Sequence, residues 1–364
     1  MVIEAIDHIE FYVEDADQAA SHLCDAFGFR IHGRGGPETG LDGCRSILLS
    51  QGDIIILVTS ALRADHPAAD YVWQHGDGVA VIAVTASDAD AAFAEAVEHG
   101  AVPVAPPVVV GRGGARVTFA TVNAFGDVAY RFVAREAPGG PFAPGMIAQT
   151  SPGPVSGGLL TAVDHIAVCV PAGELAGTVR RHQEVFGFTG TFEERIVVGS
   201  QAMDSKVMQS PSGKVTLTII EPDDTREPGQ IDEFVRSHGG AGVQHVAFRT
   251  DDITAAIRAI SGRGVRFLST PPSYYDTLMA RLGPLGVPVE TLRELSILAD
   301  RDNWGAMRQI FTESRHPRRT LFYELIDRRG ARTFGSNNIK ALYEAVERQR
   351  AADQALRSQA AFTG

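Results

Sequence analysis

Two stretches with almost the same order of apolar and polar residues begin the two halves of the chain. IDHIEFYV occupies residues 6–13 and VDHIAVCV occupies residues 163–170, and both have the apolar pattern of a buried β-strand. A stretch with helical periodicity follows each, DADQAASHLCDAFGF in the first half and ELAGTVRRHQEVFGF in the second. Both end in Phe-Gly-Phe, where the glycine suits the left-handed position that follows many helices. The repeat therefore predicts a strand and then a helix in each half.

Further strands are predicted after each of these helices. RSILLSQGDIIILVTS (45–60) and SKVMQSPSGKVTLTIIEP (205–222) each contain two apolar runs separated by turn residues, as in a β-hairpin. Each half then begins again, because residues 78–101 align with residues 242–265 as a strand, an acidic helix start and an Ala-rich helix. Two more strand-like runs end each half. The chain is thus predicted to hold four βαβββ modules.

The organisation of these modules predicts the fold class. A βαβββ module leaves one sheet face uncovered, and two modules can wrap their sheets into a half-open barrel with the helices outside. This arrangement resembles the vicinal-oxygen-chelate fold, an α+β architecture, here with two half-open barrels. Residues 137–158 are rich in Pro, Gly and Ser and are typical of a linker. We therefore predict an N-terminal domain at 1–150 and a C-terminal domain at 151–364.

Three potential metal ligands occur on strands of the second half. His165 lies on the first strand of one module, His245 on the first strand of the next, and Glu324 on the last strand. Such side chains are costly in apolar surroundings unless they are paired. Two imidazoles and one carboxylate are the ligand set of non-haem Fe(II) oxygenases, which keep open positions for substrate and O2. These ligand types at symmetry-related strand positions predict a metal site in the second half.

The first half lacks this ligand set at the equivalent positions. His8 corresponds to His165, but Val81 has no donor atom and Arg131 carries a positive charge where Glu324 carries a negative one. We expect no metal site in the first half. His8 is predicted to be a packing or hydrogen-bonding residue.

Composition and charge indicate which kinds of partner the protein can bind and in which cell compartment it is expected. The net charge of −11 argues against binding to nucleic acid, and no apolar run is long enough for a membrane span. The N-terminus has no signal-peptide pattern, and the three cysteines lack the spacing of a disulfide framework or a zinc ribbon. These features predict a reduced, cytoplasmic protein that acts on small molecules. His182 and His238 lie in polar stretches and are expected to be solvated.

Several longer motifs make a family resemblance specific. GAGVQHVAF, PPSYYD, RQIFTE, RRTLFYELIDRRG and FGSNNIKALYEAVER occur in the second half. With these motifs the chain resembles the 4-hydroxyphenylpyruvate dioxygenase family from about residue 5 to residue 350. The resemblance implies Fe(II) held by His165, His245 and Glu324, and 4-hydroxyphenylpyruvate and O2 as substrates. A homodimer is a further expectation.

The family includes enzymes that form homogentisate, by attack on the ring, and enzymes that form 4-hydroxymandelate, by attack on the benzylic carbon. Thr218 and Ile220 stand where the homogentisate-forming enzymes typically have Pro and Asn, and Ile339 stands where they have Phe. These three differences resemble the hydroxymandelate-forming members, and that resemblance implies (S)-4-hydroxymandelate as the product, with CO2 released by decarboxylation of the 2-oxo acid. Neutral drift within a homogentisate-forming enzyme is the alternative. An extradiol catechol dioxygenase and a non-enzymatic binding module are more remote ones.

The resemblance assigns further substrate-binding positions. Besides Thr218, Ile220 and Ile339, these are Ser205, Gln230, Gln309, Phe322 and Asn338. By the period of two in a strand, Phe322 is expected on the face of Glu324, and Gln244 on the face opposite to His245.

Two segments of the second half are predicted to be helical additions. A helix at 336–358 is expected to close the barrel mouth, or alternatively to pack outside the barrel. The 79 positions from His245 to Glu324, against 50 from Val81 to Arg131, predict a helical insertion at 274–300.

Overall fold

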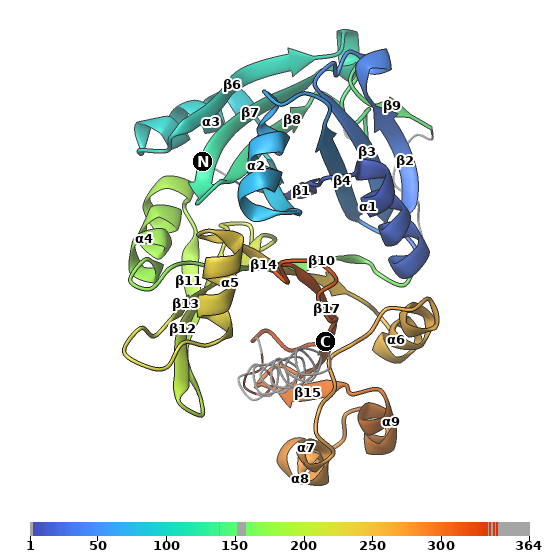
Figure 1. The fold of residues 1–364 in the computed structure, drawn as a ribbon, viewed down its shortest axis with the longest axis vertical. Coiled ribbons are helices and arrows are strands. Elements are labelled where there is room, and N and C mark those ends of the chain that lie inside the picture. The colour runs from blue at the N-terminus through green and yellow to red at the C-terminus, as the bar shows by residue number, and fades with distance from the viewer. Residues whose placement is uncertain are drawn as a thin grey trace, which may run out of the picture.

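The structure, a computed structural model, describes residues 3–137, 139–150, 158–333, 335, 338 and 340. Its strands form one sheet of nine strands and one of eight. The two sheets lie one above the other, with helices at their flanks (Figure 1).

The nine-stranded sheet contains the strands of the first half. In chain order, its elements are β1 (Ala5–Tyr12), α1 (Ala16–His22), β2 (Arg30–Gly35), β3 (Cys44–Gln51), β4 (Ile54–Ala61), α2 (Pro67–His75), β5 (Gly78–Thr85), α3 (Ala89–Glu98), β6 (Pro103–Val110), β7 (Val117–Phe125), β8 (Val128–Arg135) and β9 (Ala148–Gln149). The strand order is β6-β7-β8-β5-β1-β4-β3-β2-β9. Each module therefore stays contiguous in the sheet, and β1 pairs with β5 where the two modules meet.

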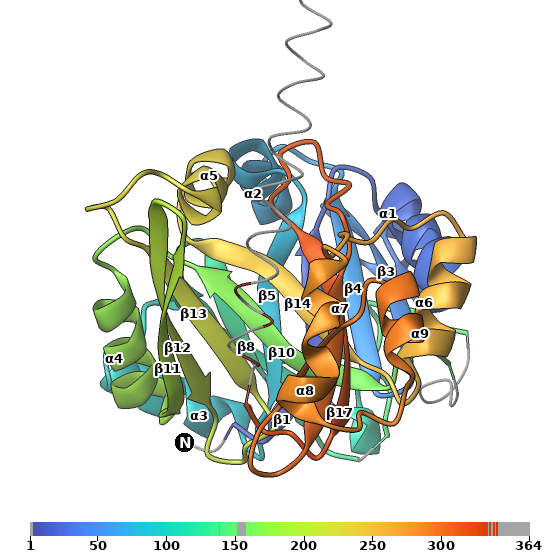
Figure 2. The ribbon, with the colours of Figure 1, turned by 90° about the horizontal axis from the view of Figure 1, so that it is seen from below.

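The eight-stranded sheet repeats this topology. Its elements are β10 (Ala162–Cys169), α4 (Leu175–Phe186), β11 (Thr189–Val198), β12 (Gln201–Gln209), β13 (Thr216–Pro222), α5 (Gln230–His238), β14 (Gly242–Arg249), α6 (Ile253–Gly262), α7 (Ser273–Asp276), α8 (Leu278–Leu282), α9 (Val289–Glu294), β15 (Leu298–Arg301), β16 (Ala306–Phe311) and β17 (Phe322–Arg329). The strand order is β11-β12-β13-β10-β14-β17-β16-β15. Figure 2 views this half from below, with α5 beside α2 at one end of the sheets.

The predicted fold class is confirmed. Four βαβββ modules form two curled sheets, and α7, α8 and α9 occupy the predicted helical insertion. Gly28 and Gly187, the glycines of the two Phe-Gly-Phe motifs, have φ of 82° and 70°, in the left-handed region. Gly28 ends the π-helical segment η1 (Leu23–Phe27) that continues α1, and Gly187 ends α4. Most of the predicted helix at 336–358 lies outside the described residues.

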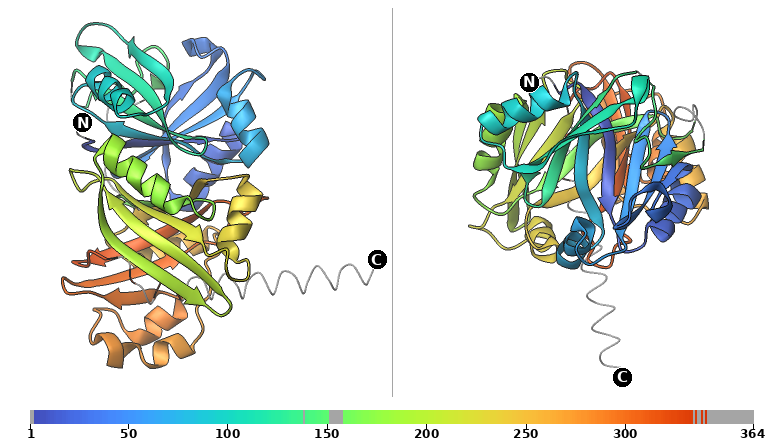
Figure 3. Two further views of the ribbon diagram at one scale, coloured as in Figure 1. Left: turned by 90° about the vertical axis from the view of Figure 1, so that its left-hand side faces the viewer. Right: turned by 90° about the horizontal axis from the view of Figure 1, so that it is seen from above.

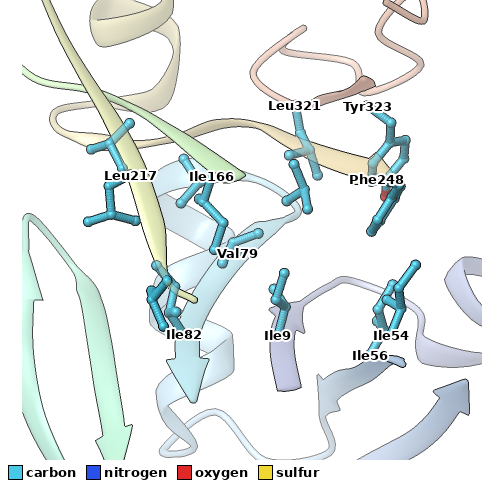
Figure 4. Packing of buried hydrophobic residues seen from close by; sticks show 14 of the residues in the cluster. Ile9, Ile54, Ile56, Val79, Ile82, Ile166, Leu217, Phe248, Leu321 and Tyr323 are labelled. Carbon is cyan, nitrogen blue, oxygen red and sulfur yellow. The ribbon is translucent and has the colours of Figure 1, made fainter. Parts of the chain in front are cut away.

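The two sheets pack against each other through their outer faces. One continuous apolar cluster joins side chains of both halves, and Figure 4 shows Ile9, Ile56 and Ile82 of the first sheet facing Ile166, Leu217 and Phe248 of the second. These second-half residues alternate along their strands with the predicted site residues. Because successive side chains in a strand point to opposite faces, this core directs the site residues to the concave side of the sheet. Figure 3 shows the two sheets stacked in this way.

The predicted linker is only partly a linker. Within residues 139–150, Phe142, Ala143 and Ile147 are buried against the first sheet, and β9 pairs with β2. The Pro- and Gly-rich composition predicted a linker although the segment contains these few apolar residues that pack on the sheet. The predicted domain boundary at 150/151 stays a prediction, since residues 151–157 lie outside the described chain.

The prediction that His182 and His238 are solvated is wrong. Both are buried, with exposed fractions of 0% and 3%. His182 on α4 donates from Nδ1 to the Thr178 carbonyl, and its Nε2 accepts from the hydroxyl of Tyr130 in the other half. His238 on α5 stacks on His75 of α2, with ring centroids 4.3 Å apart. Contacts between the halves, which local polarity does not reveal, bury both rings.

Because these two histidines are buried, we predict that the protein is less stable at acidic pH. Burial lowers the pKa of His182 and of His238 from 6.5 to about 4. The unfolded chain therefore binds more protons than the folded chain between pH 6.5 and 4, and the free energy of unfolding falls as the pH falls through this window, by up to about 3 kcal/mol for His182. Urea unfolding at pH 7.5, 6 and 5 measures the slope. A His182→Gln variant with the wild-type slope contradicts the assignment.

No helix among the described residues is long and apolar enough to cross a bilayer.

Candidate metal centre

The three predicted ligands lie together on adjacent strands. His165 is on β10, His245 on β14 and Glu324 on β17, and these strands are neighbours in the sheet. One donor atom of each residue lies within 4.8 Å of the others, and all three side chains are buried. Oε2 of Glu324 is 3.2 Å from Nε2 of His165 and 3.4 Å from Nε2 of His245. The sheet register thus brings together residues that are far apart in sequence.

The electrostatics of this cluster favour a bound cation. Burial alone would lower the pKa of His165, but Glu324 and Asp164 raise it to about 9. Burial alone would raise the pKa of Glu324, but the two imidazoles lower it. An ionised carboxylate between two imidazoles provides one negative charge and, once a metal ion displaces the Nε2 proton of His165, three converging lone pairs. This donor set fits a divalent transition metal such as iron.

Each histidine is oriented by the residue that precedes it. Nδ1 of His165 lies 3.0 Å from Oδ1 of Asp164, and Nδ1 of His245 lies 3.2 Å from Oε1 of Gln244. The carboxylate and amide oxygens accept the Nδ1 protons, so each ring turns its Nε2 toward the other ligands, where a metal can bind. Arg328 also pairs with Asp164, at 2.8 Å.

β-bulges explain these unusual positions. The pairing of β10 with β14 skips Asp164, which lies between Val163 and His165 on β10. It also skips Gln244, which lies between Val243 and His245 on β14. A bulge adds one residue to a strand and redirects its side chain. The prediction that Gln244 points away from His245 is therefore wrong.

The predicted alignment of the two halves is confirmed by the sheet registers, and the absence of a metal site in the first half stays a prediction. In the β1–β5 register Glu10 pairs with Val81, and in the β5–β8 register Ala83 pairs with Arg131, which matches the pairing around His245 and Glu324. His8 is buried and its Nδ1 lies 2.7 Å from Asp7, as predicted for a hydrogen-bonding histidine.

Most of the predicted substrate-binding residues lie around the same concave face. Thr218 and Ile220 on β13 pair with Ala167 and Cys169, which follow His165 at intervals of two. Ser205 on β12 pairs with Ile220, and Phe322 on β17 pairs with His245. The Phe322 ring stacks on the His245 ring at 4.9 Å and 24°. The β13, β12 and β17 residues thus share the face of the metal ligands.

The other predicted residues surround this face. Gln309 on β16 is two residues from Phe311, which pairs with Glu324. Gln230 is the first residue of α5, whose Ile231 and Phe234 pack on Ile220. Asn338 is buried and accepts a hydrogen bond of 2.7 Å from Tyr274. Ile339 lies outside the described residues.

Four of these residues have buried polar atoms without a hydrogen-bond partner in the described chain. They are Oγ1 of Thr218, Nε2 of Gln230, Oε1 of Gln309 and Nδ2 of Asn338. Buried polar groups are normally paired, and each exception needs an explanation. A polar ligand on the concave face would supply the missing partners.

Comparisons with known proteins agree with this geometry. Two family models, both described as Glyoxalase/Bleomycin resistance protein/Dioxygenase superfamily, match the chain, one at residues 5–127 and the other at residues 164–279. The chain is 34% identical to a 4-hydroxyphenylpyruvate dioxygenase of Dictyostelium discoideum, over 95% of this chain and 98% of that protein. For the same enzyme of Yarrowia lipolytica the identity is 32%, over 95% and 92%. This chain belongs to the 4-hydroxyphenylpyruvate dioxygenase family. It is therefore an enzyme of a dioxygenase family.

A solved structure of this family is also similar. A triple mutant of 4-hydroxymandelate synthase from Streptomyces coelicolor aligns with a TM-score of 0.88 and 42% identity, over 96% of this chain and 100% of that one. The similarity extends across both half-barrels.

Sequence reasoning missed the residues that orient the ligands of this family member. The role of Asp164 could have been predicted from the sequence, because an Asp-His pair occurs at the equivalent place in both halves, as Asp7-His8 and Asp164-His165. The role of Gln244 could not, since its position depends on a bulge. Arg328 is near Asp164 only through the pairing of distant strands.

Replacing Gln244 tests its positioning role. Gln244→Leu is expected to weaken iron binding by about 10- to 100-fold, because the Nδ1 proton of His245 loses its acceptor. Gln244→Glu keeps an acceptor and should bind iron much more tightly than the leucine variant. Titration of the metal-free protein with Fe(II) under anaerobic conditions measures both. Equal affinities for the two variants would contradict the role.

Proposed function

We propose that the chain is an Fe(II)-dependent enzyme that converts 4-hydroxyphenylpyruvate and O2 into (S)-4-hydroxymandelate and CO2. The observation that carries the proposal is the buried cluster of His165, His245 and Glu324 on three adjacent strands. The 42% identity to a 4-hydroxymandelate synthase supports the choice of product. Such a product would serve secondary metabolism as a precursor of arylglycines.

His165, His245 and Glu324 would hold the iron. The bound metal would supply a chelation site for the 2-oxo acid and the redox chemistry needed to react it with O2. The substrate contains its own 2-oxo acid, so no separate 2-oxo acid is needed. The protein contributes the fixed imidazole orientations through Asp164 and Gln244.

The surrounding residues would bind and orient the substrate. The apolar wall of Ile220, Phe311 and Phe322 accommodates an aromatic ring, and Phe322 also fixes the plane of the His245 imidazole. Thr218, Gln230, Gln309 and Asn338 provide the four unpaired polar atoms for the polar ends of the substrate. Ser205, whose hydroxyl donates to the Glu194 carbonyl at 3.3 Å, lies next to Ile220.

The apolar side chain at 220 would direct the reaction to the benzylic carbon. Ile220 packs in a cluster with Cys169, Met203 and Phe234 and offers no hydrogen bond to the ring end of a substrate. The position of the ring relative to the metal decides which carbon is attacked, and small differences in position separate competing reactions.

The wider assignment follows from the same proposal. Residues 151–364 would form the catalytic domain, closed by the C-terminal helix, and residues 1–150 a domain without a metal site. The three cysteines form no disulfide, which supports a reducing compartment such as the cytoplasm. The homodimer stays a prediction.

Product identification tests the proposal. Protein loaded anaerobically with Fe(II) is mixed with 4-hydroxyphenylpyruvate and O2, and the aromatic product is separated by chromatography. We expect 4-hydroxymandelate with one CO2 per turnover. Homogentisate as the sole product would replace the synthase assignment with the dioxygenase one. Ring cleavage of catechols without CO2 release would favour an extradiol enzyme.

A further inference from the structure

The first half-barrel contains a cavity of its own. Its volume is about 320 Å³, and its walls come from the concave faces of β1, β3, β4, β7 and β8, from β6 and from residues 142–147. Cavities of about 150 Å³ are already large enough to bind benzene. A half-barrel that had only lost its metal would be expected to fill such a space with apolar side chains.

His8 gives this cavity an unpaired hydrogen-bond acceptor. Asp7 accepts the Nδ1 proton of His8, and Arg135 pairs with Asp7. Nε2 of His8 lies on the opposite side of the ring, is buried, and has no hydrogen-bond partner in the described chain. In the neutral ring this atom carries a lone pair and no proton.

His8 is oriented by the same kinds of contact as His165, the histidine of the metal cluster. Asp7 and Arg135 occupy the positions equivalent to Asp164 and Arg328, and both make the equivalent contacts. Burial raises the pKa of Asp7, but the hydrogen bond from His8 and the ion pair with Arg135 lower it to about 2. Asp7 therefore stays ionised and holds the His8 ring with Nδ1 toward its carboxylate and Nε2 directed away from it.

The charged groups of the cavity wall and of the Asp7–Arg135 pair behind His8 balance. Arg131 pairs with Glu10 at 2.5 Å, and Glu10 also accepts a hydrogen bond from Thr59. Arg135 pairs with Asp7. Because each cation has its own carboxylate, a charged ligand would have to be buried without a partner, which is unfavourable. The cavity is suited to an uncharged ligand.

The rest of the wall suits an aromatic ring. Leu57, Phe119, Phe142 and Ile147 contribute apolar surface to the cavity. The ring of Phe142 lies edge-on to His8, with centroids 4.7 Å apart. An aromatic ligand would therefore contact aromatic side chains close to the unpaired acceptor.

We propose that the first half-barrel binds a small uncharged phenol, whose hydroxyl donates a hydrogen bond to Nε2 of His8 and whose ring packs against Phe119 and Phe142. This site is separate from the metal centre and does not depend on the proposed function.

Calorimetric titration with p-cresol tests the proposal. Because the second half-barrel is also proposed to bind a phenol ring, the titration uses the full-length iron-loaded protein saturated with 4-hydroxyphenylpyruvate in the absence of O2. We expect one p-cresol per chain, and at least tenfold weaker binding of toluene, which has no hydroxyl. Absence of p-cresol binding under these conditions would overturn the proposal.

Two tryptophan variants on β6 locate the site without altering the core. Ala105 and Val104 are both exposed, but only Ala105 lines the cavity. Ala105→Trp should weaken p-cresol binding at least tenfold, whereas Val104→Trp should bind as the wild type does. His8→Phe should show the same loss as Ala105→Trp. Equal binding by all variants, or p-cresol seen only beside His165 in a crystal, would refute the site.

Discussion

Replacing Glu324 with alanine is expected to abolish iron binding and turnover. Glu324 supplies the only carboxylate of the three-residue cluster, and its Oε2 lies within 3.4 Å of both imidazole Nε2 atoms. Without it, two neutral imidazoles remain, and the cation loses its compensating negative charge in a buried site. Removal of a residue that only orients a ligand costs about 10- to 100-fold in metal affinity, so loss of the ligand itself should cost more.

The repeat provides a matched control for this variant. His8→Ala removes the histidine equivalent to His165 in the half that lacks the other two ligands, and should leave the iron content at the wild-type level. Iron content after anaerobic loading and oxygen consumption with 4-hydroxyphenylpyruvate measure both effects. A Glu324→Ala protein that retains stoichiometric iron and activity would refute the metal centre. Circular dichroism establishes that both variants fold.

The metal cluster could be predicted because the two halves of the chain repeat each other and can be compared position by position. The repeat aligned His165, His245 and Glu324 with His8, Val81 and Arg131, and the sheet registers confirm this alignment. Period-two alternation also placed Phe322 on the face of Glu324, since β17 is regular at this point. Local pattern is sufficient where the strands are regular.

The failures all come from structure that is not local. A bulge redirects Gln244, so alternation placed it on the wrong face. Packing between the halves buries His182, although its neighbours in sequence are polar. Phe142 anchors a segment whose composition is that of a linker. In each case the deciding feature is strand pairing or packing with residues distant in sequence, which composition and periodicity do not encode.

The same difference between local sequence pattern and contacts formed in the fold applies to the first half-barrel. Sequence alone indicated that the first half had lost its metal site, and left His8 with a structural role. In the structure Asp7 and Arg135 fix this ring, and its Nε2 has no hydrogen-bond partner in the described chain and faces a cavity. Loss of the metal ligands is therefore not the same as loss of a binding site.

Replacing Ile220 with asparagine is expected to change the product. Ile220 is buried on the face of His165, next to Ser205, and contributes only apolar contacts. An amide at this position adds a hydrogen-bonding group, as in the homogentisate-forming enzymes that the chain resembles, and would move the ring relative to the metal. A difference of about 1.4 kcal/mol between the two barriers changes the product ratio tenfold. We therefore expect the ratio of homogentisate to 4-hydroxymandelate to rise at least tenfold.

Ile220→Leu is the matched control, because it preserves volume and apolarity and should form 4-hydroxymandelate as the wild type does. Chromatography of the products at equal substrate consumption gives the ratio for each variant. The measurement separates an effect on product choice from a loss of stability, since a partly unfolded enzyme turns over more slowly without changing its product ratio. If the asparagine and leucine variants give the same ratio as the wild type, the side chain at 220 does not determine which carbon is attacked.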